Sequence, residues 1–171
     1  MLSVFGREYS IDWRGCVNPR TLFSMRLLLQ RVSRASVMVD GETIGSMKKG
    51  YLLFIAVMQG DELSQAEWLA QKVVHLRLFD GENGKINDQT LRDVGGEILV
   101  ISQFTLAGSV ENGNRPEYIA AAPPATAEPL YRHFIDQLVS LGVTRVQTGK
   151  FGAHMDVELV NDGPVTLWLE K

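Results

Sequence analysis

One uninterrupted apolar stretch constrains the fold of this chain more than any other feature. It reads Tyr51-Leu52-Leu53-Phe54-Ile55-Ala56-Val57-Met58 and follows directly after Gly50. An apolar run of this length that begins at a glycine is typical of a β-strand buried on both faces. We therefore expect residues 51–58 to form such a strand.

Further strands are predicted on both sides of this run. The segment Arg26–Val39 contains Val32, Val37 and Val39, and such β-branched residues favour an extended backbone. Asp40-Gly41 is a strong signal for a two-residue hairpin turn, so Glu42–Met47 is the expected return strand. We also expect a strand over Glu97–Leu106, and two strands that close the chain and are joined through Asn161–Pro164.

Two amphipathic helices are predicted from apolar residues at helical spacing. The first begins with a capping-box pattern, Ser64 with Glu67, and runs to about Arg77. The second runs from about Thr126 to Leu141, with Pro129 in its first turn and Gly142 at its C-terminal end. Two helices among many strands in irregular order indicate an α+β, sheet-rich fold.

The length and composition fit a single domain. The chain has 171 residues, of which 45% are hydrophobic and 22% are charged, which is ordinary for a globular protein. Residues 1–24 show no sustained strand or helix pattern, so we interpret them as an extension, disordered or added by a mis-called start, and place the folded domain at 25–171. The single cysteine, Cys16, fits a reducing compartment, and no apolar run is long enough to span a membrane.

Two short polar segments are the main candidates for a functional site. Ser102-Gln103-Phe104-Thr105-Leu106 follows one apolar strand, and Asn161-Asp162-Gly163-Pro164-Val165-Thr166 follows another. Polar groups at the ends of buried strands are costly unless they are hydrogen-bonded. They either bond neighbouring backbone groups and stabilise the fold, or they line a pocket.

Other familiar chemistry is weak in this sequence. Asp80-Gly81-Glu82-Asn83-Gly84 is better explained as a hairpin turn than as a calcium loop, because the later ligand positions are missing. His75, His133 and His154 share no metal-ligand spacing, so we expect no metal site. A serine or threonine nucleophile would need His154 as its base, and the Gly-x-Ser-x-Gly elbow is absent.

A set of ordered motifs runs through residues 25–171. The motifs are Gln30-Arg31-Val32-Ser33-Arg34-Ala35-Ser36-Val37, Val94-Gly95-Gly96-Glu97, Ser102-Gln103-Phe104-Thr105-Leu106, Asn114-Arg115-Pro116, Ala122-Pro123, Gly149-Lys150-Phe151-Gly152-Ala153 and Asn161-Asp162-Gly163-Pro164-Val165-Thr166. Together they resemble the D-aminoacyl-tRNA deacylase family, formerly called D-tyrosyl-tRNA deacylases. The resemblance implies a β-barrel-like homodimer with sites at the subunit interface. It also implies hydrolysis of the ester between a D-amino acid and tRNA, with glycyl esters accepted and L-aminoacyl-tRNA rejected.

The same resemblance implies roles for individual residues. Ser102, Gln103, Phe104 and Thr105 would form the catalytic wall of the site. Gly163 and Pro164, joined by a cis peptide bond and inserted from the partner subunit, would exclude an L side chain. Phe151 and Met155 would help to wall the pocket.

An aminoacyl ester is already activated, so an oriented water and stabilisation of the tetrahedral oxyanion suffice for its hydrolysis. The backbone N–H groups of Phe104 and Thr105, with Gln103 nearby, are the candidates for that stabilisation. The resemblance also raises Thr105 as a nucleophile, but we favour a positioning role because no base lies beside it in the sequence. The 2′-hydroxyl of the terminal adenosine would then assist the reaction. No cofactor is expected.

The formal net charge of −3 predicts no strong overall attraction to nucleic acid, so tRNA contact would need a local basic track. The candidate residues for that track are Arg26, Arg31, Arg34, Arg115 and Lys150. The loop Glu111-Asn112-Gly113 departs from the family, whose members often carry a basic residue before this glycine. We expect a cytoplasmic protein that contacts neither DNA nor membranes.

Two alternatives of other classes stay open. One is a non-catalytic RNA-binding module of the same fold, which would not need the intact Ser-Gln-Phe-Thr and Gly-Pro segments. The other is a conventional serine or threonine hydrolase, which would form a covalent adduct at Ser102 or Thr105.

Overall fold

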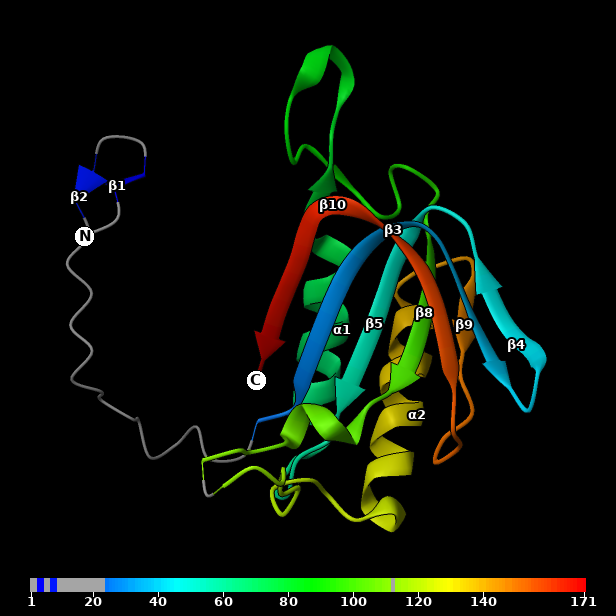
Figure 1. Ribbon diagram of the computed structural model, residues 1–171. Helices are drawn as coiled ribbons and strands as arrows, with labels where there is room; N and C mark the ends of the chain where they lie inside the picture. The colour runs from blue at the N-terminus through cyan, green and yellow to red at the C-terminus, as the bar shows by residue number, and fades with distance from the viewer. Residues whose placement is uncertain (1–2, 5–6, 9–23, 112) are drawn as a thin grey trace.

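The computed structural model describes residues 3–4, 7–8, 24–111 and 113–171, so most of the predicted extension lies outside the described residues. The main sheet has the strand order β10–β3–β5–β8–β9, with β4 paired to β3 (Figure 1). Its strands are β3 (Arg26–Val39), β4 (Glu42–Met47), β5 (Gly50–Ala56), β8 (Glu97–Ser102), β9 (Val146–Thr148) and β10 (Asp156–Glu170). The other elements are the strand pair β1 (Ser3–Val4) and β2 (Arg7–Glu8), the strand pair β6 (Arg77–Phe79) and β7 (Gln89–Thr90), and the helices α1 (Leu63–His75) and α2 (Pro124–Ser140).

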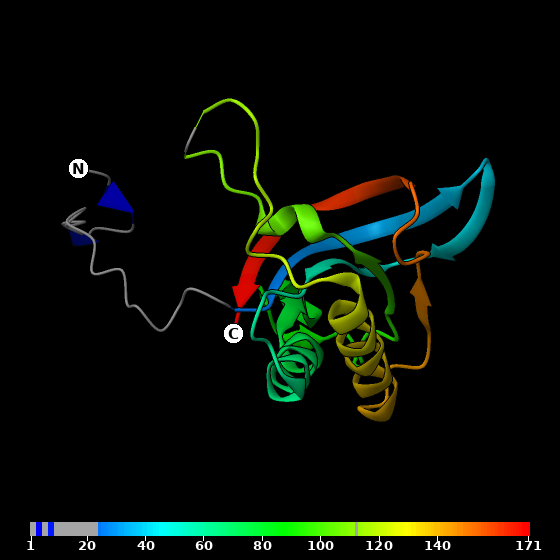
Figure 2. The ribbon, with the colours of Figure 1, turned by 90° about the horizontal axis from the view of Figure 1, so that it is seen from below.

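The apolar run that dominates the sequence forms the central strand β5. Antiparallel β3 lies on one side of β5 and parallel β8 on the other, and every β5 residue except Phe54 is buried. Helices α1 and α2 cover one face of the sheet (Figure 2). A second apolar cluster lies on the opposite side and joins Val37, Leu52 and Leu99 to Met155 and Leu159. The prediction of a strand buried on both faces is confirmed.

The sheet curls because β3 is long enough to serve two sets of partners. Residues 26–32 of β3 pair with β5, residues 35–39 pair with β4, and β10 runs antiparallel along both parts. The curled sheet is nearly closed and barrel-like, and with two main helices it confirms the predicted α+β fold. The predicted hairpin is also confirmed, because Asp40 and Gly41 have φ angles of 52° and 81°, the left-handed pair of a tight two-residue turn.

Both helices begin earlier than the sequence predicts. Glu62, rather than Ser64, caps α1, and its capping box is completed by Gln65 instead of Glu67. Helix α2 starts at Pro124, where the missing N–H and the fixed φ of proline suit the first helical position. Pro129 consequently lies inside α2 rather than in its first turn. Among the described residues, no helix is both long enough and apolar enough to cross a membrane.

Two strand boundaries also differ from the prediction. Strand β8 ends at Ser102, and the chain then turns through a short 3₁₀ helix, Phe104–Ala107, so the expected strand to Leu106 is wrong. The closing segment is one bent strand, β10, and not two: its register against β3 shifts between Asn161 and Thr166. Apolar periodicity reports which side chains are buried, and it does not report where a strand bends.

A buried carboxylate fixes the turn that precedes α1. Asp61 is only 7% exposed, and its Oδ2 accepts a hydrogen bond of 2.6 Å from the Met58 N–H. Burial raises the pKa of the Asp61 carboxyl to about 6, although the N–H groups of Met58 and Met25 partly offset that rise. Asp61 therefore belongs to the scaffold of the fold.

Candidate functional site

A cavity of about 610 Å³ lies at the end of β8, where the Ser-Gln-Phe-Thr segment leaves the sheet. Ser102, Gln103 and Phe104 contribute one side of it, Tyr131 of α2 contributes another, and Phe151 and Met155 contribute a third. The volume is within the usual range for a small-molecule site. The structure therefore brings together five of the predicted site residues in one cavity.

The backbone of the Ser-Gln-Phe-Thr segment is held by β5. Ser102 lies opposite Ile55 in the parallel register, and the Gln103 N–H donates to the Ile55 carbonyl at 2.8 Å. The first hydrogen bond of the 3₁₀ helix runs from the Leu106 N–H to the Gln103 carbonyl at 3.1 Å. The N–H groups of Phe104 and Thr105 precede that bond, so neither has an acceptor within the helix. They are available to a negatively charged oxygen next to the segment.

The side chains of this segment have different surroundings. The Phe104 ring is 57% exposed and packs edge-to-face on Tyr118, with ring centroids 5.1 Å apart. Thr105 is exposed and is not among the residues that line the cavity. Its hydroxyl accepts a hydrogen bond from the Gln103 carboxamide nitrogen. The two side chains thus hold each other at the rim of the cavity.

A nucleophile–base pair is not assembled here. His154 lines the cavity, but its side chain is 95% exposed and its Nε2 lies 3.9 Å from the Asp156 carboxylate. Within the described residues, no hydrogen bond links His154 to Ser102 or Thr105. In the same part of the chain, no group of three or more His, Cys, Asp or Glu residues is placed to hold a metal ion.

The opposite wall is built by the segment that follows β9. The Phe151 ring lies against Tyr131, with centroids 5.8 Å apart, and the Tyr131 hydroxyl donates to the Val100 carbonyl at 3.0 Å. Burial raises the pKa of the Tyr131 hydroxyl above its usual value, so this hydroxyl stays protonated. Gly149 lets Met155 approach closely, because a Cβ at this position would lie 2.5 Å from the Met155 Sδ.

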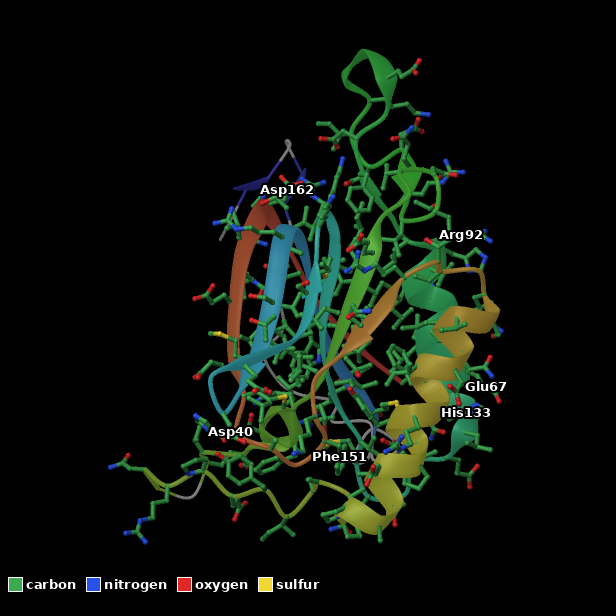
Figure 3. The ribbon with its side chains drawn as sticks, turned by 90° about the vertical axis from the view of Figure 1, so that its right-hand side faces the viewer. Asp40, Glu67, Arg92, His133, Phe151 and Asp162 are labelled. Atoms are coloured by element: carbon green, nitrogen blue, oxygen red, sulfur yellow. The ribbon has the colours of Figure 1, made fainter. Side chains whose placement is uncertain are left out.

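Gly163 and Pro164 lie far from the cavity of their own chain. They are exposed, they sit at the bend of β10, and their peptide bond is cis, as the resemblance implies. Figure 3 shows the neighbouring Asp162 at the opposite end of the sheet from Phe151. Neither Gly163 nor Pro164 lines the cavity. One chain alone does not bring the two predicted halves of the site together.

The bend at Gly163–Pro164 is fixed to β3 by side chains on both sides. The Arg31 Nε lies 3.0 Å from the Asp162 carboxylate and donates to the Asp162 carbonyl at 3.2 Å. The Asn161 carboxamide nitrogen donates to the carbonyls of Arg31, at 3.0 Å, and Val165, at 3.2 Å. We call residues 161–165 the Gly-Pro turn, and these bonds hold it rigidly to the sheet.

The predicted basic track is not continuous. Arg31 is 8% exposed and is used inside the chain, so it does not offer its charge to a phosphate. Arg26 donates to the Leu106 carbonyl at 2.8 Å, and its guanidinium carbon lies 5.9 Å from the centroid of the Trp168 ring. Arg34, Arg115 and Lys150 are exposed. The structure thus places the Arg31 charge against the Gly-Pro turn, and the tRNA contacts of the five residues stay predictions.

Some residues of the site were missed by sequence reasoning. Tyr131 and Tyr118 line the cavity, and Asn161 and Asp162 hold the Gly-Pro turn. Tyr131 lies on the buried stripe of α2, so its spacing predicts a core residue and gives no sign of a cavity wall. Asn161 and Asp162 were visible only as members of a polar segment.

Sequence comparisons with known proteins agree on one family. The family model described as D-Tyr-tRNA(Tyr) deacylase matches residues 28–170. The D-aminoacyl-tRNA deacylase of Thermomicrobium roseum is 58% identical over 147 residues, which cover 86% of this chain and 94% of that protein. A D-aminoacyl-tRNA deacylase of Cereibacter sphaeroides is 52% identical over 147 residues, which cover 86% of this chain and all of that protein. Among solved structures, the c-Myc DNA unwinding element binding protein matches with a TM-score of 0.81 and 39% identity, over 85% of this chain and 98% of that one.

Proposed function

The chain belongs to the D-Tyr-tRNA(Tyr) deacylase family, and we propose that its cavity is the site at which it hydrolyses D-aminoacyl-tRNA. It is a hydrolase of the D-aminoacyl-tRNA deacylase class, and aminoacyl-tRNA is its substrate. The products are a free D-amino acid and tRNA. We propose residues 25–171 as the catalytic domain, because 147 residues of this chain cover 94% and 100% of the two relatives named above.

The proposed chemistry uses backbone groups rather than a side-chain nucleophile. A water molecule attacks the ester carbonyl, and the carbonyl oxygen becomes an oxyanion in the tetrahedral intermediate. The N–H groups of Phe104 and Thr105, which have no acceptor within the 3₁₀ helix, are proposed to donate to that oxyanion. Ser102 and Gln103 orient the substrate beside them. The intermediate then collapses, and the bond between the acyl carbon and the 3′ oxygen of the terminal ribose breaks. The neighbouring 2′-hydroxyl is proposed to relay a proton from the attacking water to that departing oxygen, so no protein base is required.

The proposed selection against L-amino acids relies on a second copy of the chain. The observation that carries this proposal is the position of the Gly-Pro turn, exposed and remote from the cavity of its own chain. In a two-fold symmetric dimer, the turn of each subunit can enter the cavity of the other. The Gly163 and Pro164 carbonyls would then face the Cα of the substrate and clash with an L side chain, while D residues and glycine are accepted.

Exposed apolar side chains on the 3₁₀ helix and on β10 support a homodimer. The Phe104 ring and the Trp168 ring are 57% and 48% exposed, and Val160 of β10 is 38% exposed. Burial of such side chains against a second copy is favourable by about 25 cal/mol for each Å² of apolar surface removed from water. Phe151 and Met155 are proposed to complete the pocket around the substrate side chain.

The tRNA is proposed to contact the exposed cations Arg34, Arg115 and Lys150. The net charge of −3 and Glu111 in the Arg115 loop predict weak attraction to the rest of the tRNA. We propose that the protein acts in the cytoplasm, where charged tRNA is used, without a cofactor or a membrane partner. One structural relative is named as a DNA unwinding element binding protein, and our choice of tRNA as the nucleic acid here rests on the deacylase family to which the chain belongs.

A paired assay tests the proposed function. The protein is incubated with D-tyrosyl-tRNA and L-tyrosyl-tRNA at equal concentrations, and the loss of each ester is measured. We expect the D ester to be hydrolysed while the L ester persists. Equal loss of both would contradict the proposed selection, and binding of tRNA without loss of either would indicate an RNA-binding module.

A substitution at Thr105 separates a positioning role from a nucleophilic one. Thr105→Val removes the hydroxyl that Gln103 contacts but keeps the backbone N–H, so we expect the rate on D-tyrosyl-tRNA to fall by no more than about tenfold. A nucleophile would cost several orders of magnitude. Incubation with a fluorophosphonate gives an independent result: we expect no covalent label at Ser102 or Thr105, and labelling of either would establish a conventional hydrolase.

A further inference from the structure

Arg31 contacts a second element on the side away from the Gly-Pro turn. Its Nη1 donates to the Leu78 carbonyl in β6. Its guanidinium carbon lies 5.9 Å from the centroid of the Phe79 ring, within the range of a cation–π contact. The residue that holds the Gly-Pro turn is therefore itself held by β6.

The Phe79 ring is fixed in turn by a second aromatic ring. Phe79 and Tyr51 are stacked, with centroids 5.2 Å apart and ring planes at 14°. Tyr51 lies directly opposite Arg31 in the register of β3 and β5. Both rings are almost completely buried, at 1% and 0% exposure. The two rings belong to the main buried apolar cluster and form a packed surface beside the Arg31 side chain.

The Tyr51 hydroxyl plays no visible part in this arrangement. It is buried, and within the described residues it has no hydrogen-bond partner. Burial raises the pKa of this hydroxyl well above its usual value, so it stays neutral. The ring of Tyr51, rather than its oxygen, is the part that packs against Phe79.

We propose that Phe79 and Tyr51 are positioning residues for the Gly-Pro turn and act on it through Arg31. This inference rests on the proposed function of the turn in rejecting L-aminoacyl-tRNA. An arginine side chain has much rotamer freedom, and Asp162 alone cannot restrict it, because the Asp162 side chain is 42% exposed. The Leu78 carbonyl and the two rings select one arginine geometry, and that geometry sets the position of the Asp162 backbone next to Gly163.

The test uses Phe79→Leu and Tyr51→Leu, which keep an apolar side chain but remove the aromatic face. Tyr51→Phe keeps the ring and removes only the unpartnered hydroxyl. Phe134→Leu is a matched control for core damage, because Phe134 is also fully buried in the same apolar cluster but belongs to α2. Each variant is assayed on D- and L-tyrosyl-tRNA, and hydrogen exchange of the 161–165 backbone is followed by mass spectrometry.

For Phe79→Leu and Tyr51→Leu we expect the ratio of L to D hydrolysis to rise by about tenfold, with faster exchange over 161–165. Tyr51→Phe and Phe134→Leu should leave both quantities unchanged. Unaltered exchange and an unaltered ratio in the two Leu variants would overturn the proposal, and so would equal effects in Phe134→Leu. The exchange measurement is independent of activity: if it responds while the unaltered protein accepts L esters, the positioning role holds and the proposed function of the turn fails.

Discussion

A chain that carries both Gly163→Ala and Pro164→Ala is expected to hydrolyse L-tyrosyl-tRNA roughly a hundredfold faster than the unaltered protein. A Cβ at Gly163 would lie 3.1 Å from the Asn161 Oδ1, so the Asn161 carboxamide has to shift by a few tenths of an ångström, which disturbs its bonds to Arg31 and Val165. Loss of the proline ring also releases the fixed φ of residue 164. The carbonyls of the turn then no longer stand rigidly where an L side chain would be.

The rate on D-tyrosyl-tRNA should fall by less than about tenfold, because the Ser-Gln-Phe-Thr segment is unchanged and it supplies the proposed catalytic groups. Both rates are measured as kcat/KM with the two esters in parallel. Pro116→Ala, on an exposed loop that does not line the cavity, is the control for a loss of proline in general. A double variant that still rejects the L ester would show that the turn is not the selective element.

Phe104→Pro is expected to lower kcat on D-tyrosyl-tRNA by about a hundred- to a thousandfold. Proline removes the backbone N–H that is proposed to stabilise the oxyanion. It is otherwise compatible with the first position of the 3₁₀ helix, because the Phe104 N–H makes no bond within that helix and the preceding Gln103 is outside the α region, with φ −141° and ψ 73°. The fold of the segment should therefore survive.

Phe104→Leu is the matched control, since it changes the same side chain but keeps the N–H. It should retain activity within about tenfold of the unaltered protein. Circular dichroism and thermal unfolding of both variants exclude a general loss of structure. Equal activity of the Pro and Leu variants would mean that this N–H makes no contribution to the reaction.

The scaffold could be read from the sequence because its signals are local. The Tyr51–Met58 run, the Asp40-Gly41 turn and the apolar stripes of the two helices each report on burial or backbone shape within a few residues. The helix boundaries were predicted less accurately, because several nearby residues can cap a helix or begin it. Glu62 with Gln65 caps α1 in place of the pattern at Ser64, and α2 begins at Pro124 rather than at Thr126.

The site was only partly predictable for a physical reason. Ser102–Phe104, Phe151 and Met155 line one cavity, as the resemblance led us to expect of one site. The position of Arg31 could not be anticipated, because an arginine in a strand reads as a surface charge unless its partners are known. Those partners, Asp162 and Leu78, are distant in the sequence and meet Arg31 only in the folded chain.

The central claim is that each site combines the cavity of one chain with the Gly-Pro turn of another, and mixed dimers test it most directly. Phe104→Pro chains and chains with Gly163→Ala and Pro164→Ala are given different affinity tags and produced together. Mixed dimers are then isolated through both tags and assayed on the two esters.

In a mixed dimer, the intact cavity belongs to the double-alanine chain and the intact turn belongs to the Phe104→Pro chain. If turns cross between subunits, these two parts form one normal site in each mixed dimer. We then expect a mixed dimer to hydrolyse D-tyrosyl-tRNA at about half the rate of an unaltered dimer and to reject L-tyrosyl-tRNA. If each turn instead serves its own chain, the intact cavity keeps its defective turn. Continued hydrolysis of L-tyrosyl-tRNA by the mixed dimers, or failure to obtain any mixed dimers, would contradict the account.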